Sequence, residues 1–166
     1  MSILRITTWK IQKLSYLTDR TRYAIKTKHG NVPLRAVVGI ADPFNASAEF
    51  MLVHEAYRNK SINLGIHWVL SFDIDASITD EIALEIATKV CKFHSTHQHV
   101  LGISKLEKTP NKHVHVVTNT ISALTGNYIG LSPLELRNWK IFTNNVLKVY
   151  GLNPIKIFSY DQTLEL

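Results

Sequence analysis

Two histidines separated by one valine occur in the segment HVHVVTN, residues 113–119, which is otherwise typical of a buried β-strand. Successive side chains of a strand point to opposite faces, so His113 and His115 must share a face. Neutral imidazole is a common ligand for divalent cations, and two ligands at this spacing can reach one ion. The pair therefore indicates a metal site. The structural alternative is two histidines on the solvated face of a half-buried sheet.

The expected metal is Mg²⁺ or Mn²⁺. A structural zinc site usually needs four protein ligands, several of them cysteine, and the chain has one cysteine, Cys91. An open site that holds Mg²⁺ or Mn²⁺ together with a phosphate suits a protein that acts on DNA. Cys91 is interpreted as a core residue of a helix. A lone cysteine excludes an internal disulfide and fits a reducing cytoplasm.

The net charge of +6 is unevenly placed along the chain. Residues 1–36 hold eight Lys and Arg against one acid, which gives +7, and the remainder holds eleven against twelve, which gives −1. A one-sided basic segment indicates a polyanionic partner, most often nucleic acid. A merely solvated basic surface is the alternative.

Tyr23 lies inside this basic segment, in RTRYAIKTKHG. A tyrosine can attack phosphorus and hold DNA as a phosphotyrosyl ester, which conserves the energy of the broken bond for rejoining. A nearby metal would polarise the scissile phosphate. Tyr16, seven residues earlier, could lie on the same helix face and is the rival nucleophile. Either tyrosine could instead be a packed or hydrogen-bonding aromatic residue.

Hydrophobic periodicity and turn signals predict the elements that must position these residues. Strands are expected at residues 2–8, 34–41, 65–74, 99–107, 113–122 and 155–159. Helices are expected at residues 10–25, from about 47 to 60, at 77–93 and at 132–150. Ser47, Ser77 and Ser132 are the expected N-caps, and Gly151 is the expected stop of the last helix.

Two of the expected helices have clear apolar stripes. One stripe comprises Ile78, Ile82, Ile86, Val90 and Phe93, and the other comprises Trp139, Phe142, Val146 and Val149. Helices alternating with a strand-rich middle predict an α/β (α+β) sandwich, with a central, mostly antiparallel sheet and helices on its faces. A single domain over residues 1–166 is expected. No signal peptide and no apolar run of about 18 residues is present, so no membrane insertion is expected.

Four segments, in this order, resemble the relaxase domain of conjugative and mobilisation systems. More narrowly, they are similar to the mobilisation-protein and T-DNA border endonuclease branch of the HUH superfamily. The segments are RYAIKTKHG, HWVLSFD, HVHVVTN and LELRNWKIFTNNVLKVYGL, and the resemblance covers roughly residues 3–155. It implies Tyr23 as the nucleophile, His113 and His115 as metal ligands, His67 near the site, and Asn119 at the end of the third motif.

The sequence departs from the family pattern at one position. Relatives supply a third histidine before the pair, where this chain has Ser104 and Lys105, and Asn111 stands where some relatives have a further histidine. Either His67, Glu107 or a water completes the coordination, or metal binding has weakened. His67 is the preferred third ligand. Alternatively, it orients the phosphate or another ligand without touching the ion.

The resemblance implies a site- and strand-specific DNA relaxase that nicks a transfer origin and leaves 5′-phosphotyrosyl DNA. Such a nickase starts the transfer of a plasmid or integrative element in the bacterial cytoplasm. The implied partners are single-stranded or hairpin transfer-origin DNA, relaxosome accessory proteins and the coupling protein of a secretion channel. Phosphates flanking the nick would be bound by basic residues of the N-terminal segment, namely Arg20, Arg22, Lys26 and Lys28.

Three other functions stay open. The replaced third histidine favours a module that binds the origin without nicking it. A rolling-circle replication initiator uses the same constellation, and an RNA-binding α/β domain would also explain the basic patch. Relatives often have further domains, so the chain is compatible with an excised catalytic portion.

Three further histidines, His94, His97 and His99, are expected to be mostly solvated, and no role is assigned to His29 or His54.

Overall fold

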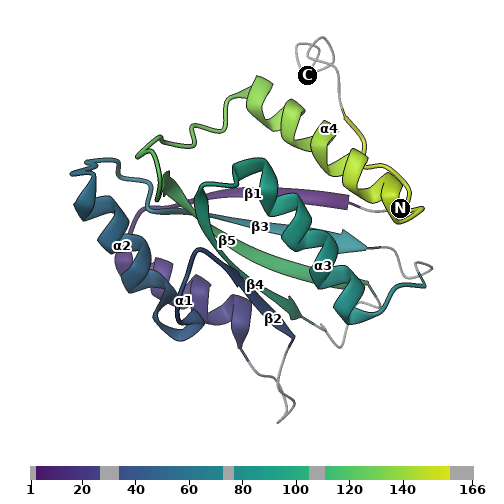
Figure 1. Ribbon diagram of the computed structural model, residues 1–166, viewed down its shortest axis with the longest axis horizontal. Coiled ribbons are helices and arrows are strands. Elements are labelled where there is room, and N and C mark those ends of the chain that lie inside the picture. The colour runs from purple at the N-terminus through teal and green to yellow at the C-terminus, as the bar shows by residue number, and fades with distance from the viewer. Residues whose placement is uncertain (1–2, 27–33, 73–76, 105–110, 158–166) are drawn as a thin grey trace.

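The computed structural model describes residues 3–26, 34–72, 77–104 and 111–157 (Figure 1). Within these ranges a five-stranded sheet has the strand order β1-β3-β5-β4-β2, and every neighbouring pair is antiparallel. The strands are β1 (Ile3–Ile11), β2 (Arg35–Val38), β3 (Gly65–Phe72), β4 (His97–Ser104) and β5 (Lys112–Ser122). The predicted antiparallel sheet is therefore confirmed.

Helices cover both faces of this sheet, as predicted for a sandwich (Figure 1). Helices α1 (Leu14–Ile25) and α2 (Ala46–Ala56) pack on one face, and α3 (Asp80–Val90) and α4 (Pro133–Val149) pack on the other. Two 3₁₀ turns, η1 (Pro43–Asn45) and η2 (Cys91–His94), precede α2 and follow α3. No helix in the described ranges is long and apolar enough to cross a membrane.

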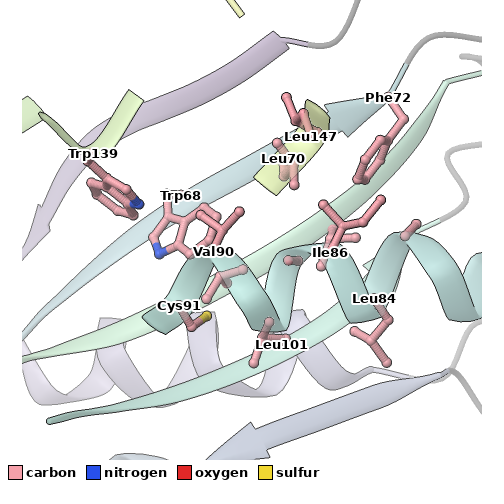
Figure 2. Packing of buried hydrophobic residues seen from close by; sticks show 14 of the residues in the cluster. Trp68, Leu70, Phe72, Leu84, Ile86, Val90, Cys91, Leu101, Trp139 and Leu147 are labelled. Carbon is pink, nitrogen blue, oxygen red and sulfur yellow. The ribbon is translucent and has the colours of Figure 1, made fainter. Parts of the chain in front are cut away.

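The core under α3 and α4 is built on alternate residues of β3 (Figure 2). Trp68 and Phe72 are fully buried there against Ile86 of α3 and against α4. The rings of Trp68 and Trp139 meet edge to face, with centroids 5.1 Å apart. Trp68 is thus a core residue, and Cys91, predicted to be a core residue, is buried in the same cluster. Because side chains alternate along a strand, His67 points to the opposite face, under α1.

Several helix and strand boundaries differ from those predicted, because contacts with distant parts of the chain determine where these elements begin and end. The helix predicted from Lys10 begins at Leu14, since Lys10 and Ile11 pair with β3 as the end of β1. In the segment predicted as a last strand, residues 155–157 form no strand, and 158–159 lie outside the described residues. Val149 is exposed, and the neighbouring Leu147 occupies the buried position expected for it.

One predicted N-cap is confirmed and two are wrong. Ser132 caps α4, where its hydroxyl accepts a hydrogen bond from the Glu135 amide at 3.2 Å. The cap of α3 is Thr79 and not Ser77, since the Thr79 hydroxyl accepts from the Ile82 amide. Helix α2 begins at Ala46, directly after the turn η1, so Ser47 lies inside its first turn.

The prediction that His94, His97 and His99 are mostly solvated is wrong. All three are buried where η2 leads into β4, with His99 only 1% exposed. The His99 imidazole bonds the Thr118 hydroxyl at 2.9 Å and the His94 carbonyl at 3.0 Å. Burial lowers the pKa of His94 to about 3 and that of His99 to about 4. These rings are therefore neutral core groups under ordinary conditions.

We expect the buried histidines to make the fold acid-sensitive. The unfolded chain regains an ordinary histidine pKa, so below pH 6.5 it takes up protons that native His94 and His99 do not. Together these two residues should lower the free energy of unfolding by about 2–3 kcal/mol between pH 7.5 and pH 5.5. Urea unfolding at both pH values measures the loss, and His94→Gln with His99→Gln should remove the part due to these two residues. An identical unfolding free energy at the two pH values would contradict the prediction.

Candidate active site

Tyr23 meets two histidines where α1 lies across the sheet. Its ring centroid is 5.1 Å from that of His115, with the two planes nearly perpendicular at 89°. The His67 ring lies 6.5 Å from the same tyrosine. Residues from α1, β3 and β5 therefore converge at one place. The predicted nucleophile and two predicted metal ligands are brought together there.

Gly102 of β4 makes this close approach possible. It stands opposite His115 in the β4–β5 register, and a Cβ at this position would lie 1.7 Å from the backbone oxygen of Ala24. The last turn of α1 thus rests directly on the backbone of β4, with Tyr23 next to the contact. The sequence interpretation missed this residue, although a glycine inside a strand is a known sign of close backbone approach.

His67 and His115 contact each other across adjacent strands. His67 Nε2 lies 3.1 Å from His115 Nδ1, and the rings are stacked with centroids 5.3 Å apart. Both side chains are buried. Burial, and then the charge of Arg20, lower the pKa of His67 to about 4. His67 is therefore neutral near pH 7, the state in which an imidazole can bind a metal.

This pair fits two positions in the coordination shell of one ion. Nitrogens that each lie about 2.0–2.1 Å from a metal, at tetrahedral or octahedral angles, are roughly 3 Å apart. His113 shares the strand face of His115 and is half-buried, opposite Ser71 of β3. No group of three His, Cys, Asp or Glu side chains within the described ranges has a metal-binding arrangement. The described residues therefore offer two adjacent histidine nitrogens that could bind one ion.

Arg20 lies between the two candidate tyrosines on α1. Its guanidinium carbon is 4.6 Å from the Tyr16 ring centroid and 5.9 Å from that of Tyr23. Tyr16, Arg20 and Tyr23 thus follow one stripe of the helix. Seven residues of helix span about 10 Å, so Tyr16 stands two turns away from the tyrosine that meets the histidines. The geometry favours Tyr23 over Tyr16.

One protein family matches most of the chain. The family model described as relaxase, MobA/VirD2-like, nuclease domain, matches residues 16–152. The chain belongs to this relaxase family. No curated protein matches it significantly. A solved structure from work on the molecular basis of vancomycin resistance transfer in Staphylococcus aureus is 14% identical, with a TM-score of 0.46, and 76% of each chain is covered.

Most of the other residues predicted to bind phosphate or metal in this relaxase domain are not placed beside Tyr23 and the histidines. Arg22 is exposed on α1, and Lys26 is exposed directly after the end of this helix. Three further residues considered in the sequence, Lys28, Lys105 and Glu107, lie outside the described residues. The described part of the relaxase therefore places one predicted phosphate-binding residue, Arg20, directly beside the tyrosine and the histidines.

A buried network of polar side chains, which the sequence interpretation missed, lies beside the relaxase site. Asn119 is fully buried, and its side-chain oxygen lies 2.9 Å from His54 Nε2. Its amide nitrogen donates to the Gln98 side chain at 2.9 Å. The network joins α2, β4 and β5. His54, to which no role was assigned, therefore helps to anchor α2, against which α1 packs.

Proposed function

We propose that this relaxase domain nicks one strand of transfer-origin DNA by attack of Tyr23 on a phosphodiester. The observation that supports the proposal is the placement of Tyr23 against the His67–His115 pair. The expected partner is a single-stranded or hairpin origin. Relaxosome accessory proteins and a secretion-channel coupling protein are expected to join it in the bacterial cytoplasm, on a plasmid or an integrative element.

In this mechanism the Tyr23 phenolic oxygen forms a bond to phosphorus while the bond from phosphorus to the 3′ oxygen breaks. The phenolic proton leaves to water, and a proton from solvent completes the 3′-hydroxyl. The product is a 5′-phosphotyrosyl ester whose reversal rejoins the strand. Arg20, beside both Tyr23 and His67, would hold a non-bridging phosphate oxygen and orient the phosphorus toward the phenol.

The proposed cofactor is Mn²⁺ or Mg²⁺. His67 and His115 would hold it, with His113 as the further candidate on the same strand face. When bound, such an ion would offset the charge that builds on the phosphate. The burial that keeps His67 neutral also limits competition from protons for its nitrogen.

The test is the formation of a covalent protein–DNA band on labelled single-stranded oligonucleotides that tile the native transfer origin. We expect the band with Mn²⁺ and its loss with chelator. His115→Ala should reduce the rate by at least about 10–100-fold, because even indirect partners of metal ligands have effects of this size. Leu134→Ala, on the exposed surface of α4, is the matched control. An undiminished band with chelator would contradict the metal-dependent mechanism.

One observation favours a second function, a recognition module that binds the origin without cutting it. The described residues include two converging histidines, but no group of three His, Cys, Asp or Glu among them has a metal-binding arrangement. Tight, salt-sensitive binding of the origin oligonucleotide with no covalent band under Mn²⁺ or Mg²⁺ would establish that function instead.

A further inference from the structure

A groove runs between α1 and the segment formed by η1 and α2. It has a volume of about 480 Å³, within the range of small-molecule sites. Its lining includes Leu14, Thr18 and Arg22 of α1, and Phe44, Met51 and Leu52 of the facing segment. Leu14, Phe44 and Leu52 are each more than half exposed. The groove therefore presents apolar surface to solvent beside the basic helix that contains Tyr23.

Phe44 is held in an exposed position by its backbone. The Asp42 carboxylate accepts a hydrogen bond from the Phe44 amide at 2.9 Å. The Glu49 carboxylate accepts from the Ala41 and Asp42 amides, each at 2.9 Å. These bonds fix the turn η1 while the aromatic ring stays exposed. A rigid, exposed aromatic ring is well suited to stacking with a planar partner.

Two arginines give the site its charge. The guanidinium carbon of Arg35 lies 4.6 Å from the centroid of the Phe44 ring, and Arg35 is not among the residues that line the groove. Arg22 lines the groove and directly precedes Tyr23 in α1. Within the described ranges neither arginine pairs with a carboxylate. Both are therefore available to bind phosphates.

Three carboxylates near the groove differ in how far they offset the positive charge of the two arginines. Asp42 and Glu49 are occupied with backbone amides of the turn. Glu55 lines the groove and is the one lining residue with a carboxylate. Glu55 is exposed, so solvent and salt screen its charge.

We propose that this groove binds one unpaired base of the DNA strand beside the cleavage position. Phe44 stacks on the base, and Arg22 and Arg35 bind the adjoining phosphates. The inference rests on the proposed function, since it takes the strand attacked by Tyr23 as the ligand. It adds a subsite on the far side of α1 from the histidines.

The first measurement separates base binding from cleavage. Tyr23→Phe protein with chelator is titrated with the fluorescent single-stranded origin oligonucleotide, so no covalent step enters the readout. Adding Phe44→Ala should weaken binding by about tenfold, within the range found for base–aromatic stacking. Phe44→Trp should restore the affinity, and Leu134→Ala should leave it unchanged. Binding to the same sequence as a duplex should not change with Phe44→Ala, because a duplex offers no unpaired base.

The second measurement locates the base. Oligonucleotides with 5-iodouracil at successive positions are irradiated with the same protein, and the cross-linked peptide is identified. A cross-link to Phe44 from one position supports the subsite. Unchanged affinity of Phe44→Ala, an equal loss for duplex, or a cross-link pattern that omits Phe44 overturns it and leaves the proposed nicking intact. Failure of the parent protein to bind the strand at all would overturn both.

Discussion

Replacing Tyr23 by phenylalanine is expected to abolish the covalent protein–DNA product. The phenylalanine ring retains the edge contact with His115, whose ring centroid lies 5.1 Å away, but it lacks the oxygen that would bond to phosphorus. Loss of a nucleophile without loss of packing should lower the rate by on the order of 10³-fold or more. A denaturing gel of labelled origin DNA, run after incubation with Mn²⁺, measures the adduct directly.

Tyr16→Phe is the matched control for this prediction. Tyr16 belongs to the same helix stripe, and its ring lies against the Arg20 guanidinium. Its replacement should leave the adduct within a few-fold of the original, and single-stranded DNA should bind both variants alike. If Tyr16→Phe abolished the adduct and Tyr23→Phe did not, the nucleophile would be Tyr16, two turns along the helix.

Gly102→Ala is expected to displace α1, and with it Tyr23, from the sheet. The added Cβ would meet the Ala24 backbone oxygen at 1.7 Å, and a backbone atom has no rotamer by which to move away. Helix α1 must therefore shift, which should cost about 1–3 kcal/mol of unfolding free energy. A displacement near 1 Å at the reacting group can lower the rate by about 10²-fold, so the adduct should fall by a similar factor.

Gly130→Ala is the control, because a Cβ at Gly130 would meet no atom within 4 Å. It should leave both the urea midpoint and the adduct unchanged. Circular dichroism on Gly102→Ala would separate a displaced helix from an unfolded chain. A Gly102→Ala variant with the original urea midpoint and the original adduct rate would show that α1 does not depend on the close contact.

Local patterns in the sequence predicted much of the fold. The apolar period of residues 80–90 and the capping of residues 132–135 depend on neighbours a few positions away, so the helices there were predictable. Alternation along residues 113–122 likewise placed His113 and His115 on one face of a strand. The same period placed Trp68 and His67 on opposite faces of β3.

The errors occurred where distant contacts decide the outcome. His94, His97 and His99 were expected to be solvated. His97 and His99 are buried where β4 pairs with β5, and His94 is buried against the rings of Phe93 and Trp139. Lys10 and Ile11 fit the apolar pattern of the helix that follows them, yet they pair with β3 as the end of β1. Val149 was predicted to be buried, but it is exposed and Leu147 is buried instead, because the rotation of a helix about its axis is set by the surface it covers, here β3.

The sequence by itself determined the composition of the site: a tyrosine in a basic helix, two histidines on one strand face, and a third histidine on another strand. Only the tertiary structure decided that His115 meets His67, 48 residues away, at 3.1 Å, and that Tyr23 lies against this pair. The physical reason is that periodicity fixes which face a side chain occupies but not which faces meet. That choice depends on strand order and on the absence of a side chain at Gly102, which lets α1 reach the sheet.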